Sequence, residues 1–260
     1  MPARSPEMVL LLTCEHGGNR VPPAYRSLFQ GKRKLLQSHR GWDPGALVLA
    51  RMLERRLRDG FSVALIAATT TRLLIDLNRS ATNPHAFSDV VEPLPWSERS
   101  RILWHHYLPH LAAVVSAVAE PVLQGTTVVH VGVHTFAPVR NGERRTMDVG
   151  LLYDPPRPPE RALCDTWKRR LEAASPDLVV RRNAPYRGTS DGLTTILRQR
   201  FPAELYLGIE LEVNQRFPRR AGPPWTRLQG LLATTLRDAL GGISGTNGEQ
   251  KSARTRRAES

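Results

Sequence analysis

The stretch Val9–Pro22, VLLLTCEHGGNRVP, decides the fold that the sequence predicts. Its unbroken apolar run begins at Met8, stops before polar residues and is followed by Gly17-Gly18. A short apolar run bounded by glycine is typical of a strand buried on both faces. The polar side chains after it then lie at the carboxyl edge of a sheet, where open α/β sheets bind ligands. His16 lies at that edge and is either a metal ligand, a proton carrier or a solvated turn residue.

Strand and helix patterns alternate along the rest of the chain. Apolar or alternating runs predict further strands over 61–67, 69–79, 126–136, 149–153, 178–180 and 205–213. Helical periodicity predicts helices over 46–58, 97–118, 155–174, 191–199 and 225–240, the second of them kinked at Pro109. This alternation favours a single three-layer α/β/α domain over 1–242 with a largely parallel, mixed central sheet. The basic tail over 243–260 lacks large apolar residues, and we expect it to be disordered.

Composition argues for a globular protein without a membrane span. The chain of 260 residues is 40% hydrophobic, which is enough for a core. No apolar stretch approaches the roughly 20 residues that a spanning helix needs. The segment Met1–Cys14 resembles a lipoprotein signal only faintly, because its apolar run is too short. Cys14 and Cys164 form no disulfide framework, so we expect a reducing compartment and a cytoplasmic location.

The net charge of +13 at pH 7 raises the question of a nucleic-acid partner. The basic residues are mostly arginines scattered through every segment, without a stripe interleaved with aromatic residues or a known nucleic-acid motif. We therefore do not expect nucleic-acid binding. An arginine-rich composition or an anionic substrate explains the charge equally well.

Polar residues collect at five predicted strand or helix ends, and these are the candidate site residues. The five groups are Glu15/His16, Asp43, Asp76–Arg79, His134 and Glu210/Glu212. Two histidines and a carboxylate form the ligand set of a catalytic zinc site, which keeps a position open for water. A further carboxylate would then serve as general base, and arginines would receive an anionic substrate.

Each histidine and acid also has a structural alternative. Asp43 precedes a proline and is placed to cap the helix that follows. Period 2 puts His130 and His134 on one face of a core strand, where His130 is the deeper and is expected to be a satisfied core residue. His106 and His110 have the spacing of a metal clasp, although a partly buried helix face is the commoner explanation.

Six segments of the sequence resemble the N-formylglutamate amidohydrolases and their relatives. In chain order they are CEHGGNRVP, HRGWDPGA, TRLLIDLNRS, HTFAPVRNGERRTMDVGLLYD, NAPYRG with SDGLTT, and GIELEVNQ, covering nearly all of Leu11–Phe217. Each segment is modest alone, but six in the family's order are fairly specific. The resemblance implies a phosphorylase/hydrolase-like α/β fold, related to that of the zinc carboxypeptidases.

The resemblance also implies roles for individual residues. The positions expected to hold one zinc ion (Zn2+) match His16, Asp43 and His134. Glu212 matches the acid expected to move the proton during hydrolysis by metal-activated water. The pair Asn78-Arg79 resembles one that grips a substrate carboxylate, and the anion-binding candidates beyond it are Arg140 and Arg145. The implied reaction converts N-formyl-L-glutamate, or another small anionic N-acyl amino acid, to a carboxylic acid and an amino acid.

Two positions depart from the family pattern. Gly132 stands where members commonly carry an acid two residues before the metal-binding histidine, and such acids orient ligating histidines. The surroundings of His134 are therefore expected to differ. Glu210 is an unusual neighbour of Glu212, so either can be the catalytic acid and base.

Three other functions remain open from the sequence. The first is hydrolysis of a different amide or a peptide. The second is a basic, non-catalytic binder of nucleic acid or other anions. The third is a catalytically inactive paralogue that retains the fold, in which Gly132 would be a symptom of the loss.

Overall fold

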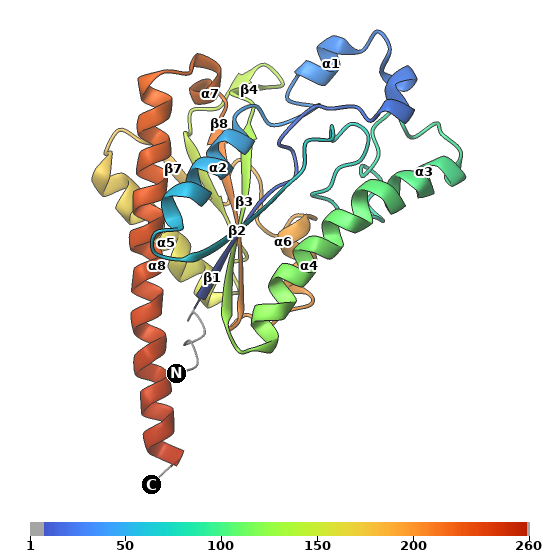
Figure 1. Ribbon diagram of the computed structural model, residues 1–260. Coiled ribbons are helices and arrows are strands. Elements are labelled where there is room, and N and C mark those ends of the chain that lie inside the picture. The colour runs from blue at the N-terminus through green and yellow to red at the C-terminus, as the bar shows by residue number, and fades with distance from the viewer. Residues whose placement is uncertain (1–7, 259–260) are drawn as a thin grey trace.

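A six-stranded sheet in the order β2-β1-β3-β8-β6-β7 forms the centre of the molecule (Figure 1). The computed structural model describes residues 8–258, with side-chain surroundings for 8–242. The strands are β1 (Met8–Cys14), β2 (Ser62–Ala67), β3 (Thr127–Phe136), β6 (Val149–Leu152), β7 (Val180–Arg182) and β8 (Tyr206–Asn214). β2, β1, β3 and β8 are parallel, β6 is antiparallel to β8, and β7 is parallel to β6. The prediction of a largely parallel, mixed sheet is confirmed.

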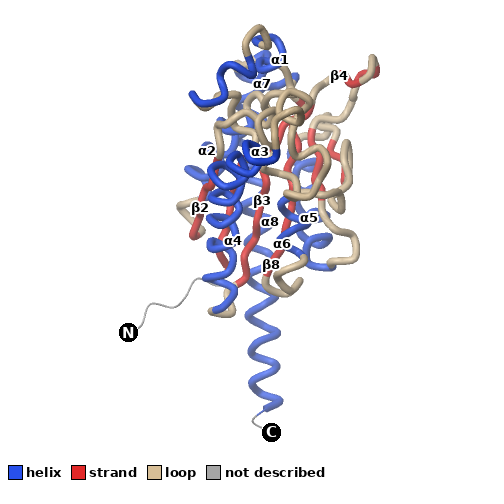
Figure 2. The backbone as a smooth tube through the Cα atoms, turned by 90° about the vertical axis from the view of Figure 1, so that its right-hand side faces the viewer, coloured by secondary structure: helices blue, strands red, loops and turns tan. Residues whose placement is uncertain are grey.

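Helices cover both faces of this sheet and complete the three predicted layers. One face carries α2 (Ala46–Leu57), α5 (Pro158–Ala174) and α8 (Pro223–Ala258), and the other carries α4 (Leu108–Leu123) and α6 (Leu193–Arg198) (Figures 1 and 2). The shorter elements are a 3-10 helix (Pro23–Phe29), α1 (Arg33–Gln37), α3 (Trp96–Ile102), α7 (Arg216–Arg220) and the hairpin β4 (Val139–Arg140) with β5 (Glu143–Arg144).

The alternation within β3 separates the apolar core from the polar face. Val129, Val131 and Val133 pack into the core under α2, α5 and α8. His130 lies on the opposite face, where Thr13 Oγ1 is 2.9 Å from its Nε2 and Tyr206 Oη is 2.8 Å from its Nδ1. Its hydrogen bonds confirm the expectation of a satisfied core histidine, because a buried imidazole needs partners for both nitrogens.

Residues 69–79 correct one prediction, because they form turns and extended loop instead of a strand. The segment is held by turn bonds, such as that from Leu74 N to Thr71 O at 3.0 Å. Its consecutive apolar side chains are all buried, in a separate apolar cluster beneath the loops. An unbroken apolar run is equally compatible with a strand and with a loop buried on several sides.

The predicted helix over 97–118 is interrupted, as its proline suggests. α3 runs into a π-helical turn, Leu103–Tyr107, before α4 begins. Pro109 stands at the start of α4 and lacks the N–H that would bond to the preceding turn.

α8 extends to Ala258, well beyond the predicted end at residue 240. The expectation of a disordered tail concerns 243–260, whose side chains lie outside the described residues, and it stays a prediction. Within the part of the chain that the structure describes, none of the helices has the length and apolar character needed to cross a bilayer.

Candidate metal centre and active site

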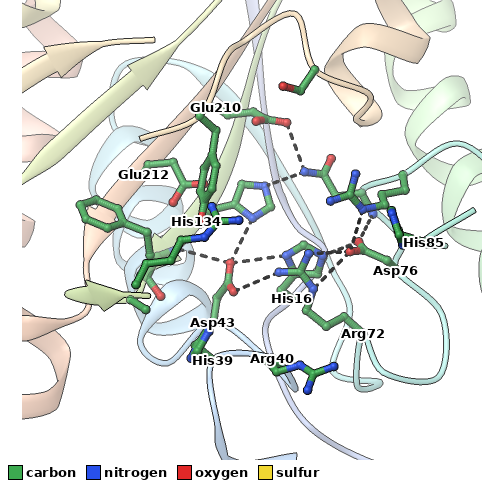
Figure 3. A pocket seen from close by; sticks show the side chains of 18 of the residues that line it. His16, His39, Arg40, Asp43, Arg72, Asp76, His85, His134, Glu210 and Glu212 are labelled. Atoms are coloured by element: carbon green, nitrogen blue, oxygen red, sulfur yellow. Dashed lines mark hydrogen bonds and ion pairs between the residues drawn. The ribbon is translucent and has the colours of Figure 1, made fainter. Parts of the chain in front are cut away.

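A cavity of about 550 Å³ lies at the carboxyl ends of β1, β3 and β8. The nine residues with a metal, catalytic or substrate role predicted from the sequence all line it: His16, Asp43, Asn78, Arg79, His134, Arg140, Arg145, Glu210 and Glu212. Figure 3 labels the two histidines, Asp43 and the two glutamates among them. The parallel strands deliver them there because their carboxyl ends share one edge of the sheet. Residues more than 190 positions apart in the chain thus face one space.

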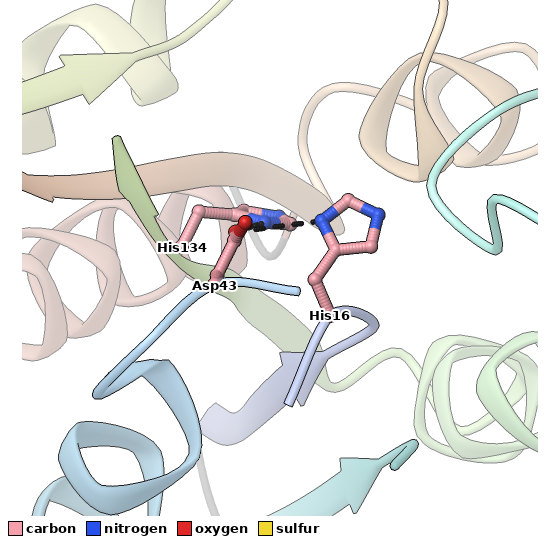
Figure 4. Close-up of side chains that lie close together, drawn as sticks. All are labelled: His16, Asp43 and His134. Atoms are coloured by element: carbon pink, nitrogen blue, oxygen red, sulfur yellow. Dashed lines mark hydrogen bonds and ion pairs between the residues drawn. The ribbon is translucent and has the colours of Figure 1, made fainter. Parts of the chain in front are cut away.

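His16, Asp43 and His134 form a buried cluster in one wall of the cavity (Figure 4). Asp43 Oδ2 lies 3.4 Å from His16 Nδ1 and 3.2 Å from His134 Nδ1. One ligand atom from each residue lies within 4.8 Å of the others. The three side chains come from the turn after β1, the segment before α2 and the end of β3.

Asp43 is not the helix cap that its place before proline suggested. Gly45 occupies the N-cap position of α2, and no side chain caps that helix. The backbone N–H of Asp43 instead donates to His16 O at 2.9 Å, and Thr135 Oγ1 donates to Pro44 O at 3.0 Å. These bonds turn the Asp43 carboxylate toward the two histidines.

Asp76 and Arg72 fix His16 on the Nε2 side of its ring. Asp76 Oδ1 lies 2.7 Å from His16 Nε2, and Arg72 Nη2 donates to Asp76 Oδ2 at 2.5 Å (Figure 3). Arg72 also reaches Asp43, at 3.6 Å. With Nε2 engaged by a carboxylate, His16 presents Nδ1, which is buried and has no hydrogen-bond partner among the described residues.

The buried acids of this cluster are kept ionised by neighbouring cations. Burial alone raises the pKa of Asp43, but the charges of His16 and Arg72 and the hydrogen bond from His134 bring it well below its usual range. The pKa of Asp76 shifts in the same direction. Burial raises it, but the charges of Arg72 and His16 and their hydrogen bonds outweigh this effect and lower the pKa of Asp76. Both carboxylates are thus available as ligands or hydrogen-bond acceptors at neutral pH.

Glu212 and Glu210 sit two residues apart on β8 but have different surroundings. β8 pairs Glu212 with His134 and Glu210 with Gly132. Glu210 Oε1 accepts a hydrogen bond from Asn78 Nδ2 at 3.2 Å, whereas Glu212 Oε2 is buried with no such partner among the described residues. Burial, followed by the charges of Asp43 and Glu210, raises the pKa of Glu212 to about 8, although His134 opposes the shift. A carboxyl with this pKa can both take and return a proton near neutral pH.

The predicted substrate residues line the same cavity. Asn78 donates to Glu210 and accepts at Oδ1 a bond of 2.8 Å from Leu193 N, so its amide is already held. Arg79 lies 3.6 Å from Asp76 through its Nε.

Arg140 and Arg145 belong to the hairpin loop after β3 and share one aromatic partner. Both guanidinium groups stack on the ring of Tyr186, at 5.9 and 5.2 Å from its centroid. Arg145 Nη1 also donates to Tyr186 Oη at 3.3 Å. Stacking leaves the edges of a guanidinium free for bidentate bonds to a carboxylate.

The sequence indicated no site role for Arg72, and it suggested Glu15 only in the strand-end group with His16 and His110 only as a metal clasp with His106. Arg72 precedes Asp76 by one helical turn's spacing, and nothing in a loop sequence signals that this pair will meet. Glu15 is next to His16 in the sequence, but its side chain meets His134 instead. The pair His106 and His110 shares no ligand: His106 lies against Tyr25, whereas His110 reaches Glu15 at 3.7 Å.

The described residues fit a bound metal ion. A buried and unpartnered His16 Nδ1, the converging Asp43 and His134, and the unpartnered Glu212 Oε2 all surround one volume of the cavity. Two imidazole nitrogens and one carboxylate are the donor set of hydrolytic zinc sites.

Comparison with known proteins gives the family. The family model described as N-formylglutamate amidohydrolase matches residues 8–217. The chain belongs to the N-formylglutamate amidohydrolase family. It is thus related to enzymes that hydrolyse amide bonds, as the six resembling segments predicted. A search of the curated proteins found no match.

Two solved structures support the same fold. A gene product of Agrobacterium tumefaciens is 30% identical, with a TM-score of 0.77, and the match covers 92% of each chain. An N-formylglutamate amidohydrolase from Ralstonia eutropha is 22% identical, with a TM-score of 0.67, and the match covers 91% of this chain and 94% of the other. The family's α/β architecture is therefore shared along nearly the whole chain.

Proposed function

We propose that the protein is a zinc-dependent amidohydrolase that converts N-formyl-L-glutamate to formate and glutamate. The observation that carries this proposal is the buried cluster of His16, Asp43 and His134 beside the unpartnered carboxyl of Glu212, at the wall of one cavity. The two free, buried cysteines are compatible with the cytoplasmic location that such an enzyme of amino-acid catabolism would have.

In this proposal His16 Nδ1, Asp43 and His134 Nδ1 hold the zinc. When bound, zinc lowers the pKa of water and polarises a carbonyl group. Asp76 supports the arrangement by accepting the Nε2 proton of His16, which keeps Nδ1 as the free donor atom.

Glu212 then moves the proton. As the oxygen of water forms a bond to the amide carbon, Glu212 takes the proton that water gives up. As the C–N bond breaks, it returns that proton to the leaving amine. Its free Oε2 and its pKa near neutrality support this role over Glu210, whose oxygen is occupied by Asn78.

Arginines orient the substrate. We assign Arg79, with Asn78, to the carboxylate next to the amide and Arg140 with Arg145 to the side-chain carboxylate, because all four line the cavity that holds the metal cluster. Guanidinium groups suit this task because they bind carboxylates through two parallel hydrogen bonds.

The test is zinc content together with formate release from a panel of N-acyl amino acids. We expect about one zinc per chain and formate release in the wild type. We expect loss of both in His134→Ala and retention of both in His105→Ala, an exposed histidine outside the cavity.

The other functions open from the sequence are separate outcomes of this test. Release of a different acyl group would keep the mechanism and change the substrate. Zinc binding without any hydrolysis would indicate an inactive paralogue, and no zinc binding would contradict the proposal and favour a basic anion binder.

A further inference from the structure

Another buried carboxylate, Glu15, lies beside His134 of the metal cluster and has no role in the proposed reaction. Glu15 is 1% exposed, and neither of its oxygens has a hydrogen bond with standard geometry to any described residue. Its Oε2 lies 3.3 Å from His134 Nε2, and its Oε1 lies 3.7 Å from His110 Nε2. An ionised carboxylate in such a place needs a compensating partner, because burial without one costs several kcal/mol.

The register of the sheet explains why Glu15 reaches His134. β1 pairs Thr13 with Gly132 of β3, and Glu15 follows Thr13 by two residues, toward the ring of His134. A Cβ on Gly132 would lie 3.5 Å from His134 Nε2, so an acid at that position would approach the same nitrogen. Gly132 carries no side chain in this space, and Glu15 reaches His134 Nε2 from the turn after β1.

Glu15 lies next to Nε2 of His134, just as Asp76 lies next to Nε2 of His16. Each carboxylate faces the Nε2 atom of one cluster histidine, at 3.3 and 2.7 Å. Each histidine in turn directs Nδ1 to the same oxygen of Asp43. The two histidines thus each have an acid at Nε2, from different elements. Asp76 makes a hydrogen bond to His16, whereas the Glu15–His134 contact is an ion pair, and His134 Nε2 also lies 3.5 Å from Asn78 Nδ2.

His110 reaches Glu15 from the helical layer. It follows the π-helical turn Leu103–Tyr107, and π-turns shift the direction of the side chains after them. Its side chain is 8% exposed, and its Nε2 has no hydrogen-bond partner among the described residues. Tyr107, at the end of the same turn, donates to Arg79 O at 2.9 Å. The end of this turn and the first residues of α4 therefore make two contacts with the site, through Tyr107 and through His110.

We propose that Glu15 is the positioning residue of His134 and that His110 is the partner that holds Glu15. Glu15 accepts the Nε2 proton of His134, which fixes the ring and leaves Nδ1 free to bind the metal. This proposal rests on the proposed zinc site, but it concerns metal affinity and can fail while the hydrolase function stands.

The experiment measures zinc affinity by competition with a chelator, in the wild type and in Glu15→Gln. We expect Glu15→Gln to weaken zinc binding about 10- to 100-fold, the usual effect of removing an acid behind a ligating histidine. Glu15→Asp keeps the charge but shortens the reach, and we expect it to weaken zinc binding less than Glu15→Gln does.

Glu160→Gln is the matched control. Glu160 is also a fully buried glutamate, but it bonds Gly208 N and Arg198, away from the cavity. We expect this variant to lower the melting temperature and leave zinc affinity unchanged. A purely structural Glu15 would behave in the same way, so the contrast between the two variants separates positioning from stability.

Wild-type zinc affinity in both folded Glu15 variants would overturn the proposal while leaving the hydrolase function intact. A wild type that binds no zinc would overturn both. Should the Glu15 variants fail to fold, His110→Gln takes their place. A several-fold loss of zinc affinity in His110→Gln would support the positioning chain, and an unchanged affinity would overturn it.

Discussion

At the scale of single residues, the surroundings of each carboxyl separate the acids of the site by role. Asp43 and Asp76 are buried among His16 and Arg72, which lower their pKa values and keep them charged. Glu212 is equally buried but has acids among its neighbours, and its pKa rises to about 8. Charged acids suit metal and histidine binding, whereas a carboxyl that titrates near neutrality suits proton transfer.

Glu212→Gln is therefore expected to lower kcat about 10²- to 10⁴-fold, the range typical for loss of a general base. Zinc content should remain that of the wild type, because Glu212 is not in the metal-binding cluster. The measurement is steady-state formate release alongside metal analysis.

Glu210→Gln is the control for this prediction, since Glu210 lies two residues away on the same strand and face. Its oxygen is occupied by Asn78, so we expect the smaller loss of kcat. A larger loss in Glu210→Gln than in Glu212→Gln would reverse the assignment.

At the scale of secondary-structure elements, the turn before α2 is a tightly constrained connection of the site. Gly45 has φ +88°, and a Cβ there would lie 2.4 Å from the Cβ of Pro218. A glycine is thus needed both for the backbone conformation and for the contact with α7, and it stands two residues after Asp43.

Gly45→Ala is expected to destabilise the protein by about 2–4 kcal/mol, because overpacking adds to the strain of positive φ. The matched control is Gly31→Ala, at φ +73° with open space around the added Cβ. This control carries only the backbone strain, about 1 kcal/mol. Urea denaturation of the two variants checks the difference. Equal decreases in the free energy of unfolding would show that Pro218 moves aside without an energetic penalty.

At the scale of the whole molecule, a buried neutral histidine links the core of the sheet to pH. His130 is fully buried, and burial, with the charges of Arg198 and His134, lowers its pKa to about 4 although Glu15 opposes the shift. In the unfolded chain a histidine titrates near pH 6.5. Between these two values the unfolded state binds the proton and the folded state does not, so stability falls as pH drops from about 6.5 to 4.

His130→Asn should flatten this dependence. Between pH 7 and pH 4 we expect the free energy of unfolding to decrease less in the variant than in the wild type. The two decreases should differ by an amount on the order of 3 kcal/mol. Urea titrations across this range, with a chelator present to keep metal binding out of the comparison, measure it. Parallel pH profiles for the two proteins would contradict a neutral His130.

The positions of residues in the fold could be predicted where the local sequence pattern and the strand topology indicate the same placement. Alternation in β3 placed the valines in the core and the histidines opposite, and the strand ends placed His16, His134 and Glu212 at one edge. The loop over 69–79 was mistaken for a strand, because its apolar run is buried under other loops and not within the sheet.

The sequence alone thus determined the α/β class from strand and helix periodicity, and the family and nine of the residues that line the cavity from motifs that resemble the family's. Only the tertiary structure decided which atoms meet: Asp76 with His16, Glu15 with His134 and His110, and Asn78 with Glu210. These pairs join residues 60 or more positions apart, so their contacts depend on sheet register and helix placement, which no local pattern encodes.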